Sequence, residues 1–462
     1  MESLTTSSPR LSVRRRGPEL IVPAKPTPCE VKKLSDIDDQ EGLHFQLPIL
    51  MYYHSVPSMK EKDVVGIIRE AMSEALVFYY PFAGRIIQGP NRKLMVECKG
   101  QGILFIEADA DITIEQLNDS MQLLPCPFIE DLLYDVPGSS GILGCPLLLI
   151  QVTQLACGGF VFAIRLNHTM SDALGLAKFL MATAEFARGA KAPSIFPVWQ
   201  RDILYARDPP HVTHAHREYD EIPINDHNKK SIMTLDQPNM AHRSFLFGPR
   251  EITSLRNHFP PHLRKCSTFE VLTACLWKCR TAALELDPDE IIRLSCMINL
   301  GGKGNQLQLP VGYYGNAFAF PAALSRAGDL CKNPLAYAID LIRKSKDLMS
   351  EEYIRSVADF MVIKGRPRYT TVWNFLVADA SRAGLVDVDF GWGKPVFGGP
   401  VGALPCGIIF NRFKNSEGED GILVPILLPR PAMEKFQDEL LKLMSEESVV
   451  YNNKHPKIPS ML

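Results

Sequence analysis

The sequence predicts an α/β protein built as two layered domains. Short runs with strand-like alternation are interspersed with helix-like periodicity along the chain, a mixture typical of sheets covered by helices. At 462 residues the chain exceeds the size at which a single hydrophobic core keeps growing, so two domains are expected. A polar, proline-containing stretch near the middle of the chain indicates the boundary between them.

The first domain is expected over residues 1–195. Within it, 47–53 and 147–155 have the pattern of strands, and 64–76 and 174–188 have the periodicity of helices. Three consecutive arginines near the start resemble part of a transit peptide. The prolines that follow break any amphipathic helix there, so we expect a frayed end that leads into a first strand.

A crossover loop is expected over residues 196–240, where prolines alternate with polar tracts. The second domain, expected over 241–446, should open with an apolar helix. Ser267 or Thr268 is the predicted N-cap of this helix, and Glu270 stands close to capping-box spacing.

Charge and cysteine content argue against several classes of protein. The 50 basic and 52 acidic residues give a net charge of −2, which provides no electrostatic footprint for nucleic acid or an anionic membrane. No apolar stretch approaches the roughly 20 residues that span a bilayer. The 11 cysteines are scattered, and the pair Cys275 and Cys279 lacks the Cys-x-x-Cys form of zinc and redox sites. We expect reduced thiols, no metal site, no nucleic-acid partner and no membrane insertion.

One histidine stands where a general base could be held rigidly. Phe162, Ile164 and Leu166 alternate along a predicted strand, His168 ends it, and Asp172 follows where a helix should begin. A general base needs a fixed position and a pKa near neutrality, and a strand-to-helix turn supplies the rigidity. The alternatives are a hydrogen-bonded core histidine at 168 and a helix-capping carboxylate at 172.

The same His-x-x-x-Asp spacing recurs at His216 and Asp220. Spacing alone is weak evidence, because roughly half a match is expected by chance in a chain of this composition. The second copy lies in the polar crossover, where we expect nothing apolar to exclude water or fix a rotamer. We therefore predict His168, and not His216, as the base.

A second cluster reads Asp389-Phe-Gly-Trp-Gly393. Two glycines permit unusual backbone dihedrals, Trp392 can pack, and Asp389 can accept a hydrogen bond or form an ion pair, as in a structural turn. A kinase Asp-Phe-Gly motif is excluded, because no glycine-rich phosphate loop and no His-Arg-Asp loop precede it.

Together these motifs resemble the plant BAHD acyl-CoA-dependent acyltransferases, over nearly the whole chain. Two further stretches look most similar to the benzyl alcohol O-benzoyltransferase branch of that family. The family motifs are Tyr79-Tyr-Pro-Phe-Ala-Gly-Arg85, His168-Thr-Met-Ser-Asp172, the helix around Trp277, Tyr313-Tyr-Gly-Asn316 and Asp389 to Gly393, and the branch stretches are 23–28 with 34–42 and 198–220.

The resemblance implies two chloramphenicol-acetyltransferase-like domains with a channel between them. Acyl-CoA would enter from one side and the alcohol from the other, and His168 would remove the hydroxyl proton. It implies no bound cofactor, with benzoyl-CoA as co-substrate, benzyl alcohol as acceptor and benzyl benzoate as product. Acetyl-CoA as donor, methanol or aliphatic alcohols as acceptors, and a binding or regulatory member of the family are the alternatives.

The resemblance also assigns Asp172 a supporting role. In the family this carboxylate points away from the substrate and pairs with an arginine, commonly two residues after the position of Asn299. Here that position holds Gly301, and Lys303 could substitute. An arginine forms a bidentate fork with a carboxylate that a lysine cannot form. We therefore predict that Gly301→Arg would raise stability or activity.

The remaining candidate residues follow from the same resemblance. Asp389 is grouped with His168 as a catalytic motif residue that acts through the shape of the channel, and Arg343 is its expected partner. A solvated basic loop and a core tryptophan are the alternatives for the substrate-binding group. The support residues are Asp172, Gly175, Phe390, Gly391, Trp392 and Gly393, and the substrate or CoA residues are Arg264, Lys265, Ser267, Thr268, Trp373 and Asn374.

The polar tail, residues 447–462, is expected to be flexible. It ends in Ser460-Met461-Leu462, which resembles the Ser-Lys-Leu peroxisomal address. We predict a peroxisomal protein recognised by the import receptor, with a cytosolic protein and an accidental tripeptide as the alternative. We expect a monomer.

Overall fold

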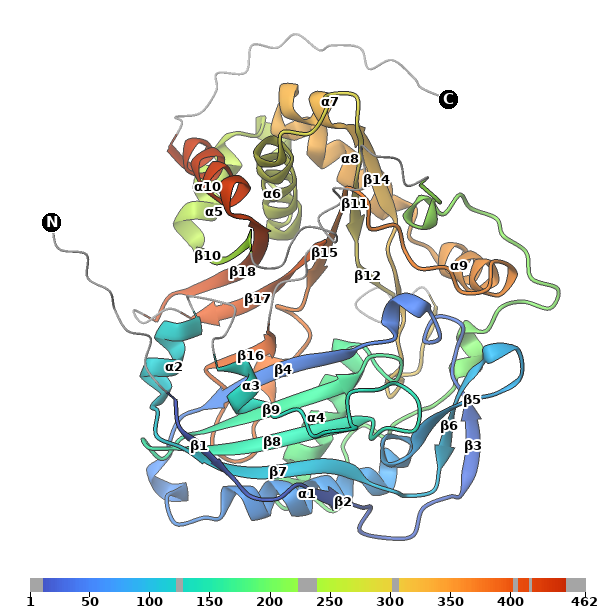
Figure 1. Ribbon diagram of the computed structural model, residues 1–462, viewed down its shortest axis with the longest axis vertical. Helices are drawn as coiled ribbons and strands as arrows, with labels where there is room; N and C mark the ends of the chain where they lie inside the picture. Colours follow the sequence, from blue (N-terminus) through green and yellow to red (C-terminus); the bar gives the residue numbers. More distant parts are fainter. Residues whose placement is uncertain are drawn as a thin grey trace, which may run out of the picture.

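The computed structural model describes residues 11–121, 128–222, 239–300, 307–401, 406–414 and 418–445. Two large sheets organise this part of the chain, and each carries helices on a face (Figure 1). Within these ranges no helix is long and apolar enough to cross a membrane.

The first sheet contains seven strands of the described chain, in the order β1-β7-β8-β9-β4-β16, with β2 also paired to β7. The predicted strands and helices of this region are confirmed to within two residues at each end. The strands are β1 (Val13–Arg15), β2 (Glu19–Ile21), β4 (Gln46–Tyr53), β7 (Ile103–Ala110), β8 (Leu148–Leu155), β9 (Phe160–Asn167) and β16 (Phe397–Pro400), and the helices are α1 (Val64–Phe78), α2 (Ile114–Met121), α3 (Ile129–Leu132) and α4 (Ala173–Ala187).

Helices α1 and α4 pack side by side against one face of this sheet (Figure 1). The Asp63 side chain caps α1 by accepting from the Gly66 amide at 2.9 Å. The apolar stripe of α1, including Ile68 and Met72, and that of α4, including Leu180, are fully buried in one core with the strands. The helical periodicity of the sequence therefore reflects an apolar face of each helix that is buried against the sheet.

One strand of the first sheet comes from the far end of the chain. Strand β16 pairs antiparallel with β4, with Phe397 opposite Tyr52 and Pro400 opposite Ile49. Residues of the predicted second domain thus complete the first sheet. The division into 1–195 and 241–446 remains a prediction made along the sequence, and β16 crosses it in space.

The second sheet contains six strands of the described chain, in the order β10-β18-β17-β15-β11-β14. Helix α6 lies at the centre of the helical layer between α10 and α8 (Figure 1). The strands are β10 (Met240–Phe247), β11 (Ile291–Cys296), β14 (Ala322–Arg326), β15 (Asn374–Asp379), β17 (Gly407–Lys414) and β18 (Asp420–Pro429), and the helices are α5 (Pro249–Asn257), α6 (Thr268–Leu284), α7 (Ala327–Lys332), α8 (Leu335–Asp347) and α10 (Arg430–Ser445).

The other described elements are smaller. They are the sheet of β3 (Glu30–Lys33), β6 (Leu94–Cys98) and β5 (Arg85–Gln88), the pair β12 (Ile298–Asn299) and β13 (Phe318–Ala319), helix α9 (Glu351–Ile363), and the 3-10 helices η1 (Glu41–Leu43), η2 (Pro57–Met59), η3 (Tyr80–Ala83), η4 (Pro90–Arg92), η5 (Arg201–Leu204), η6 (Arg217–Tyr219), η9 (Pro261–Leu263) and η10 (Leu385–Asp387).

The described part of the crossover corrects one expectation. The side chain of His216 is fully buried, and its ring lies 4.9 Å from that of Tyr353 and 5.3 Å from that of Phe360. Its Nε2 is 2.8 Å from the hydroxyl of Ser356. The expectation that nothing apolar surrounds His216 is therefore wrong, because α9 supplies that surface from much later in the sequence.

Candidate active site

His168 occupies the turn between β9 and α4. Its amide donates to the Phe45 carbonyl at 3.0 Å, and its own carbonyl accepts from Asn316 Nδ2 at 2.9 Å. The residue is only 5% exposed, and the rings of Phe45 and Phe318 lie 5.0 and 6.0 Å from the imidazole. Burial lowers the pKa of His168, since desolvation disfavours the imidazolium. The lowered pKa favours the uncharged ring, which is the form that can accept a proton.

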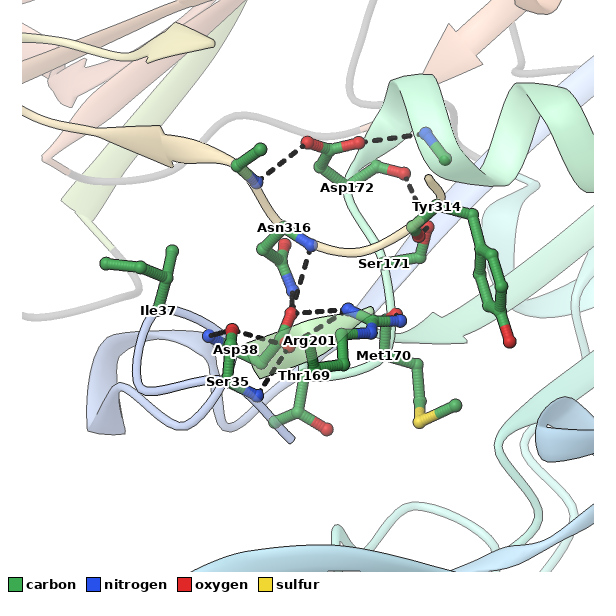
Figure 2. A network of polar contacts seen from close by, with 12 residues as sticks. Ser35, Ile37, Asp38, Thr169, Met170, Ser171, Asp172, Arg201, Tyr314 and Asn316 are labelled. Carbon is green, nitrogen blue, oxygen red and sulfur yellow. Dashed lines mark hydrogen bonds and ion pairs between the residues drawn. The ribbon is translucent and has the colours of Figure 1, made fainter. Parts of the chain in front are cut away.

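Asp172 serves the helix and not the imidazole. One carboxylate oxygen accepts from the Gly175 amide at 2.9 Å and caps α4, and Figure 2 shows this oxygen directed at the start of the helix. The other oxygen accepts from Asn299 Nδ2 at 2.6 Å and from the Ala317 amide at 3.4 Å. Burial raises the pKa of Asp172 against these hydrogen bonds. The capping alternative is thus the observed geometry.

The Asn299 side chain donates a hydrogen bond to Asp172. Asn299 stands two residues before the position at which the family arginine was expected. Gly301 and Lys303 lie outside the described residues, so the proposed effect of Gly301→Arg stays a prediction. Gly175 behaves as expected, because a Cβ built on it would lie 2.2 Å from the Tyr314 carbonyl oxygen. Only glycine lets the two backbones approach so closely.

A buried ion pair lies beside the His168 turn, and the sequence analysis did not identify it. Arg201 Nη1 is 2.8 and 2.9 Å from the two carboxylate oxygens of Asp38, and both side chains are fully buried (Figure 2). Arg201 Nη2 also donates to the Met170 carbonyl at 2.8 Å, and the Asn316 amide donates to Asp38 at 3.0 Å. Asp38, Arg201 and Asn316 all lie in stretches that carry the family resemblance, and this resemblance is the sequence signal that could have identified them.

Three adjoining cavities lead toward this centre. The first, of about 580 Å³, begins at the N-terminus of α6 and includes the cationic side chains of Lys346, Arg382 and Arg412. The second, of about 480 Å³, shares Arg382 with the first and extends to Asp172 and to Phe318, the ring beside His168. The third, of about 330 Å³, adjoins the second; the lining residues that they share are Asp172, Leu174 and Asn299.

The structure places two of the predicted CoA residues on the first cavity. Ser267 and Thr268 line it, and Ser267 caps α6 in the predicted capping box with Glu270, whose carboxylate accepts from the Ser267 amide at 3.0 Å. Arg264 and Lys265 are not part of this lining, and Arg264 Nε instead donates to the Phe259 carbonyl at 3.1 Å.

Trp373 and Asn374 lie in the core of the second sheet. Trp373 is 8% exposed, and Asn374 is held between the Thr370 carbonyl and the Ser295 hydroxyl, at 2.7 and 3.0 Å. Neither residue lines the three cavities described above. A place for them beside the acyl group therefore stays a prediction.

The Asp389 turn packs on the first sheet. The Asp389 carboxylate accepts from the Gly391 and Gly393 amides at 2.7 and 2.9 Å, and both glycines have positive φ angles, 113° and 81°. The Phe390 ring lies against Phe162, while Trp392 meets another ring of the same core. Asp389 thus stabilises its own turn, as the structural interpretation predicted.

The expected partner of Asp389 is wrong. Arg343 lies on α8 in the second layer, where its guanidinium is 3.5 Å from Glu270. The turn lies on the first sheet, and there Arg188 donates to the backbone carbonyl of Asp389. Arg343 and Asp389 do not meet, because they belong to different layers of the fold.

The fold and the site together define an acyltransferase of the chloramphenicol-acetyltransferase type, with a buried histidine close to cavities that reach the second layer. The chain belongs to the Transferase family, the BAHD acyl-CoA-dependent acyltransferases, and the family model matches residues 11–443. It is an alcohol acyltransferase of that family.

Full-length relatives are similar to this chain. Alcohol acyl transferase 1 allele GSa of Malus domestica is 57% identical and covers 98% of this chain and 99% of its own. Benzyl alcohol O-benzoyltransferase of Petunia hybrida is 55% identical over the whole of both chains. The crystal structure of F. sporotrichioides TRI101, complexed with coenzyme A and T-2, has a TM-score of 0.67 at 16% identity, over 88% of this chain and 97% of that one.

Proposed function

We propose that the protein transfers the benzoyl group of benzoyl-CoA to benzyl alcohol and forms benzyl benzoate, with His168 as general base in a ternary complex. The observation that carries the proposal is the buried imidazole of His168 next to the Phe318 ring, which lines the second cavity, and burial lowers the pKa of that imidazole. The name of the Petunia relative supports the choice of donor and acceptor.

In the proposed reaction, His168 takes the hydroxyl proton as the alcohol oxygen attacks the thioester carbonyl. The new carbon–oxygen bond forms, the carbon–sulfur bond breaks, and the proton passes from the imidazolium to the departing thiolate. No covalent enzyme intermediate is required. General-base catalysis of this kind is worth about 10² to 10⁴ in rate, and the remainder comes from holding both substrates together and from stabilising the oxyanion.

The first cavity is the proposed binding site of acyl-CoA. Its lining combines the N-terminus of α6 with Lys346, Arg382 and Arg412, and both features favour phosphate groups. The second cavity would then carry the acyl chain toward Phe318 and His168. TRI101, which shares the fold, is complexed with coenzyme A.

A second candidate function is acyl transfer from or to other substrates, such as acetyl-CoA, methanol or aliphatic alcohols. The Malus relative, named as an alcohol acyl transferase, favours this candidate. A panel of acyl-CoA donors and alcohol acceptors, incubated with the purified protein and analysed by mass spectrometry, separates the two. The first proposal requires benzyl benzoate as the leading ester by kcat/KM. A higher value for another pair contradicts it, and no ester from any pair would indicate a binding or regulatory protein.

We further propose that the protein works as a monomer in peroxisomes, delivered by the import receptor. The tripeptide Ser460-Met461-Leu462 supports the location, and it lies outside the described residues. A fluorescent protein that carries the last ten residues should collect in peroxisomes of plant cells, whereas a diffuse signal contradicts the location. Light scattering on the purified protein tests the oligomeric state.

A further inference from the structure

Two backbone carbonyls of the His168 turn accept hydrogen bonds from side chains. The His168 carbonyl accepts from Asn316 Nδ2 at 2.9 Å, and the Met170 carbonyl accepts from Arg201 Nη2 at 2.8 Å. Among the described residues, no backbone amide donates to either carbonyl. A buried carbonyl without a donor is costly, so the conformation of this turn depends on the two side chains.

Both side chains are held by one carboxylate, that of Asp38. Arg201 Nη1 donates to its two oxygens at 2.8 and 2.9 Å, and the backbone and side-chain nitrogens of Asn316 donate to one of them at 3.0 and 2.8 Å (Figure 2). The amide and the hydroxyl of Ser35 donate to the other oxygen at 3.0 and 2.7 Å. Asp38 is therefore a common anchor, from which Arg201 and Asn316 reach the His168 turn.

The guanidinium of Arg201 is held in place on several sides. Its central carbon lies 4.5 Å from the centre of the Trp199 ring and 5.4 and 5.2 Å from those of Tyr313 and Tyr314. A Cβ built on Gly315 would lie 1.7 Å from Arg201 Nη1, so a side chain there would displace the guanidinium. A planar guanidinium offers separate nitrogens to different acceptors, whereas the ammonium group of a lysine is a single point charge.

We propose that Asp38 is a positioning residue for the acyl transfer, and that Arg201 and Asn316 transmit its position to the turn that carries His168. The inference rests on the proposed role of His168 as general base. A base must lie within hydrogen-bond reach of the proton that it takes, and a displacement of about 1 Å can lower the rate about 10²-fold. The three side chains come from the stretch before β4, from η5 and from the stretch before β13, so distant parts of the chain align the base.

The alternative role for these contacts is stability alone. Loss of a contact would then lower the melting temperature, while the folded enzyme would keep its turnover. Turnover measured well below the melting temperature of each variant separates the two roles. The variants must also keep the buried charges of Asp38 and Arg201, because an unpaired buried charge strongly destabilises a protein.

The first experiment compares Arg201→Lys with Arg207→Lys. The lysine at 201 keeps a positive charge opposite Asp38 and loses the second nitrogen that reaches the Met170 carbonyl. Arg207 is a matched control, because it lies in the same crossover and its Nε donates at 2.6 Å to the buried Asp359 of α9. For Arg201→Lys we expect kcat to fall about 10- to 100-fold, with KM for both substrates little changed. Arg207→Lys should keep both values.

The second experiment removes the other arm and leaves both buried charges paired. Asn316→Ala should lower kcat to a similar extent, whereas Asn411→Ala should not. Asn411 is the matched control, because it is buried and its Nδ2 donates to the Pro400 carbonyl at 3.3 Å, away from the turn. In the double variant of Arg201→Lys and Asn316→Ala, the loss should be smaller than the product of the two single losses, since residues that act as a unit are not additive. A loss equal to the product would overturn the common anchor.

A third measurement needs no substrate. Histidines labelled with ¹³C report on the surroundings of each ring by NMR, and the His168 signal is assigned by its loss in His168→Ala. This signal should shift or broaden in Arg201→Lys and in Asn316→Ala, and it should stay unchanged in Arg207→Lys and in Asn411→Ala. An unchanged His168 signal in the first two variants would overturn the proposal.

An unchanged kcat in folded Arg201→Lys and Asn316→Ala would indicate a role in stability alone and would also overturn the proposal. Activity is measured with the best donor and acceptor of the substrate panel, so a wrong choice of substrate does not affect the comparison. If His168→Ala kept full activity, the proposed function would fail, whereas the His168 signal would still decide whether the network anchored at Asp38 positions the ring.

Discussion

The chain contains the His-x-x-x-Asp motif twice, and the two copies differ in what surrounds them. Both histidines are buried. At His216 both ring nitrogens have partners, with Nδ1 3.3 Å from Glu218 and Nε2 2.8 Å from Ser356. At His168 the ring contacts two phenyl groups, one of which, Phe318, lines a cavity, and Nδ1 has no partner among the described residues.

The two aspartates differ as well. Asp172 is buried and caps a helix, while Asp220 is partly exposed and pairs with Arg217 and Arg293 at 3.8 and 3.5 Å. Neither spacing nor burial therefore distinguishes a reactive histidine. What distinguishes it is a ring that is held rigidly by its backbone, keeps a nitrogen available and contacts a phenyl ring that lines a cavity. Both nitrogens of His216 are already used to hold the crossover onto α9.

The sharpest test of this comparison is to remove each imidazole. His168→Ala should lower kcat by about 10² to 10⁴, because the general base is lost while the substrates still bind. His216→Ala should leave kcat within a small factor of the wild-type value. Ester formation by the purified variants, with melting temperatures to confirm folding, is the measurement. An active His168→Ala, or an inactive but folded His216→Ala, would reverse the roles assigned here.

In stability the ranking of the two variants should be reversed, because His216→Ala should lower the free energy of unfolding more than His168→Ala. Loss of His216 removes one hydrogen-bond partner each from the buried Glu218 carboxylate, which keeps the Tyr353 hydroxyl at 2.7 Å, and from the Ser356 hydroxyl, which keeps the Thr213 amide at 3.0 Å; the expected cost is about 1 to 2 kcal/mol. His168→Ala removes a ring whose Nδ1 has no partner among the described residues, and should cost less. Denaturant unfolding monitored by fluorescence gives both values. Equal losses would mean that the contacts of His216 contribute little.

The aspartates extend the comparison. Asp172→Ala removes the cap of α4 and should destabilise the protein by about 1 to 2 kcal/mol. Asp220→Ala breaks a 3.8 Å pair with the exposed Arg217 and also takes the carboxylate at 3.5 Å from the buried guanidinium of Arg293, so a similar cost of about 1 to 2 kcal/mol is expected. Urea titrations at two salt concentrations separate the two variants, since only the exposed part of the Asp220 contribution should weaken with salt. A loss for Asp172→Ala that depends on salt would contradict its assignment as a buried cap.

The smallest expected effect concerns pH. Burial lowers the pKa of His168 below its ordinary value of about 6.5. The uncharged imidazole accepts the proton, so kcat/KM should fall only as the pH drops through this depressed pKa and should be level above it. A pH profile between mildly acidic and neutral buffers shows the limb, and His216→Ala serves as the control with an unchanged profile. A limb above the ordinary value would contradict the desolvated setting.

Local features of the fold were predictable from the sequence. The strand that ends at His168 and the helix that follows Asp172 depend on periodicity and on a cap a few residues away, and both are found. Ser267 and Glu270 form the predicted capping box for the same reason. Such features are decided by neighbours along the chain.

Features that depend on distant contacts were not predictable. Asp38, Arg201 and Asn316 come from three separate stretches, and no local pattern indicates that they meet beside His168. The environment of His216 was wrongly predicted because its apolar partners belong to α9. Arg343 was assigned to the wrong acidic partner because the sequence does not show that it lies in the other layer.

Strand β16 has a consequence for how the protein folds during synthesis on the ribosome. The edge of β4 finds its partner only when residues 397–400 have been synthesised, long after β4 itself. Until then the nascent first sheet exposes an open edge, and such edges invite pairing with other chains. A truncated chain would therefore be both unfinished and prone to aggregate. The layer that holds His168 can close only after residue 400 has been synthesised.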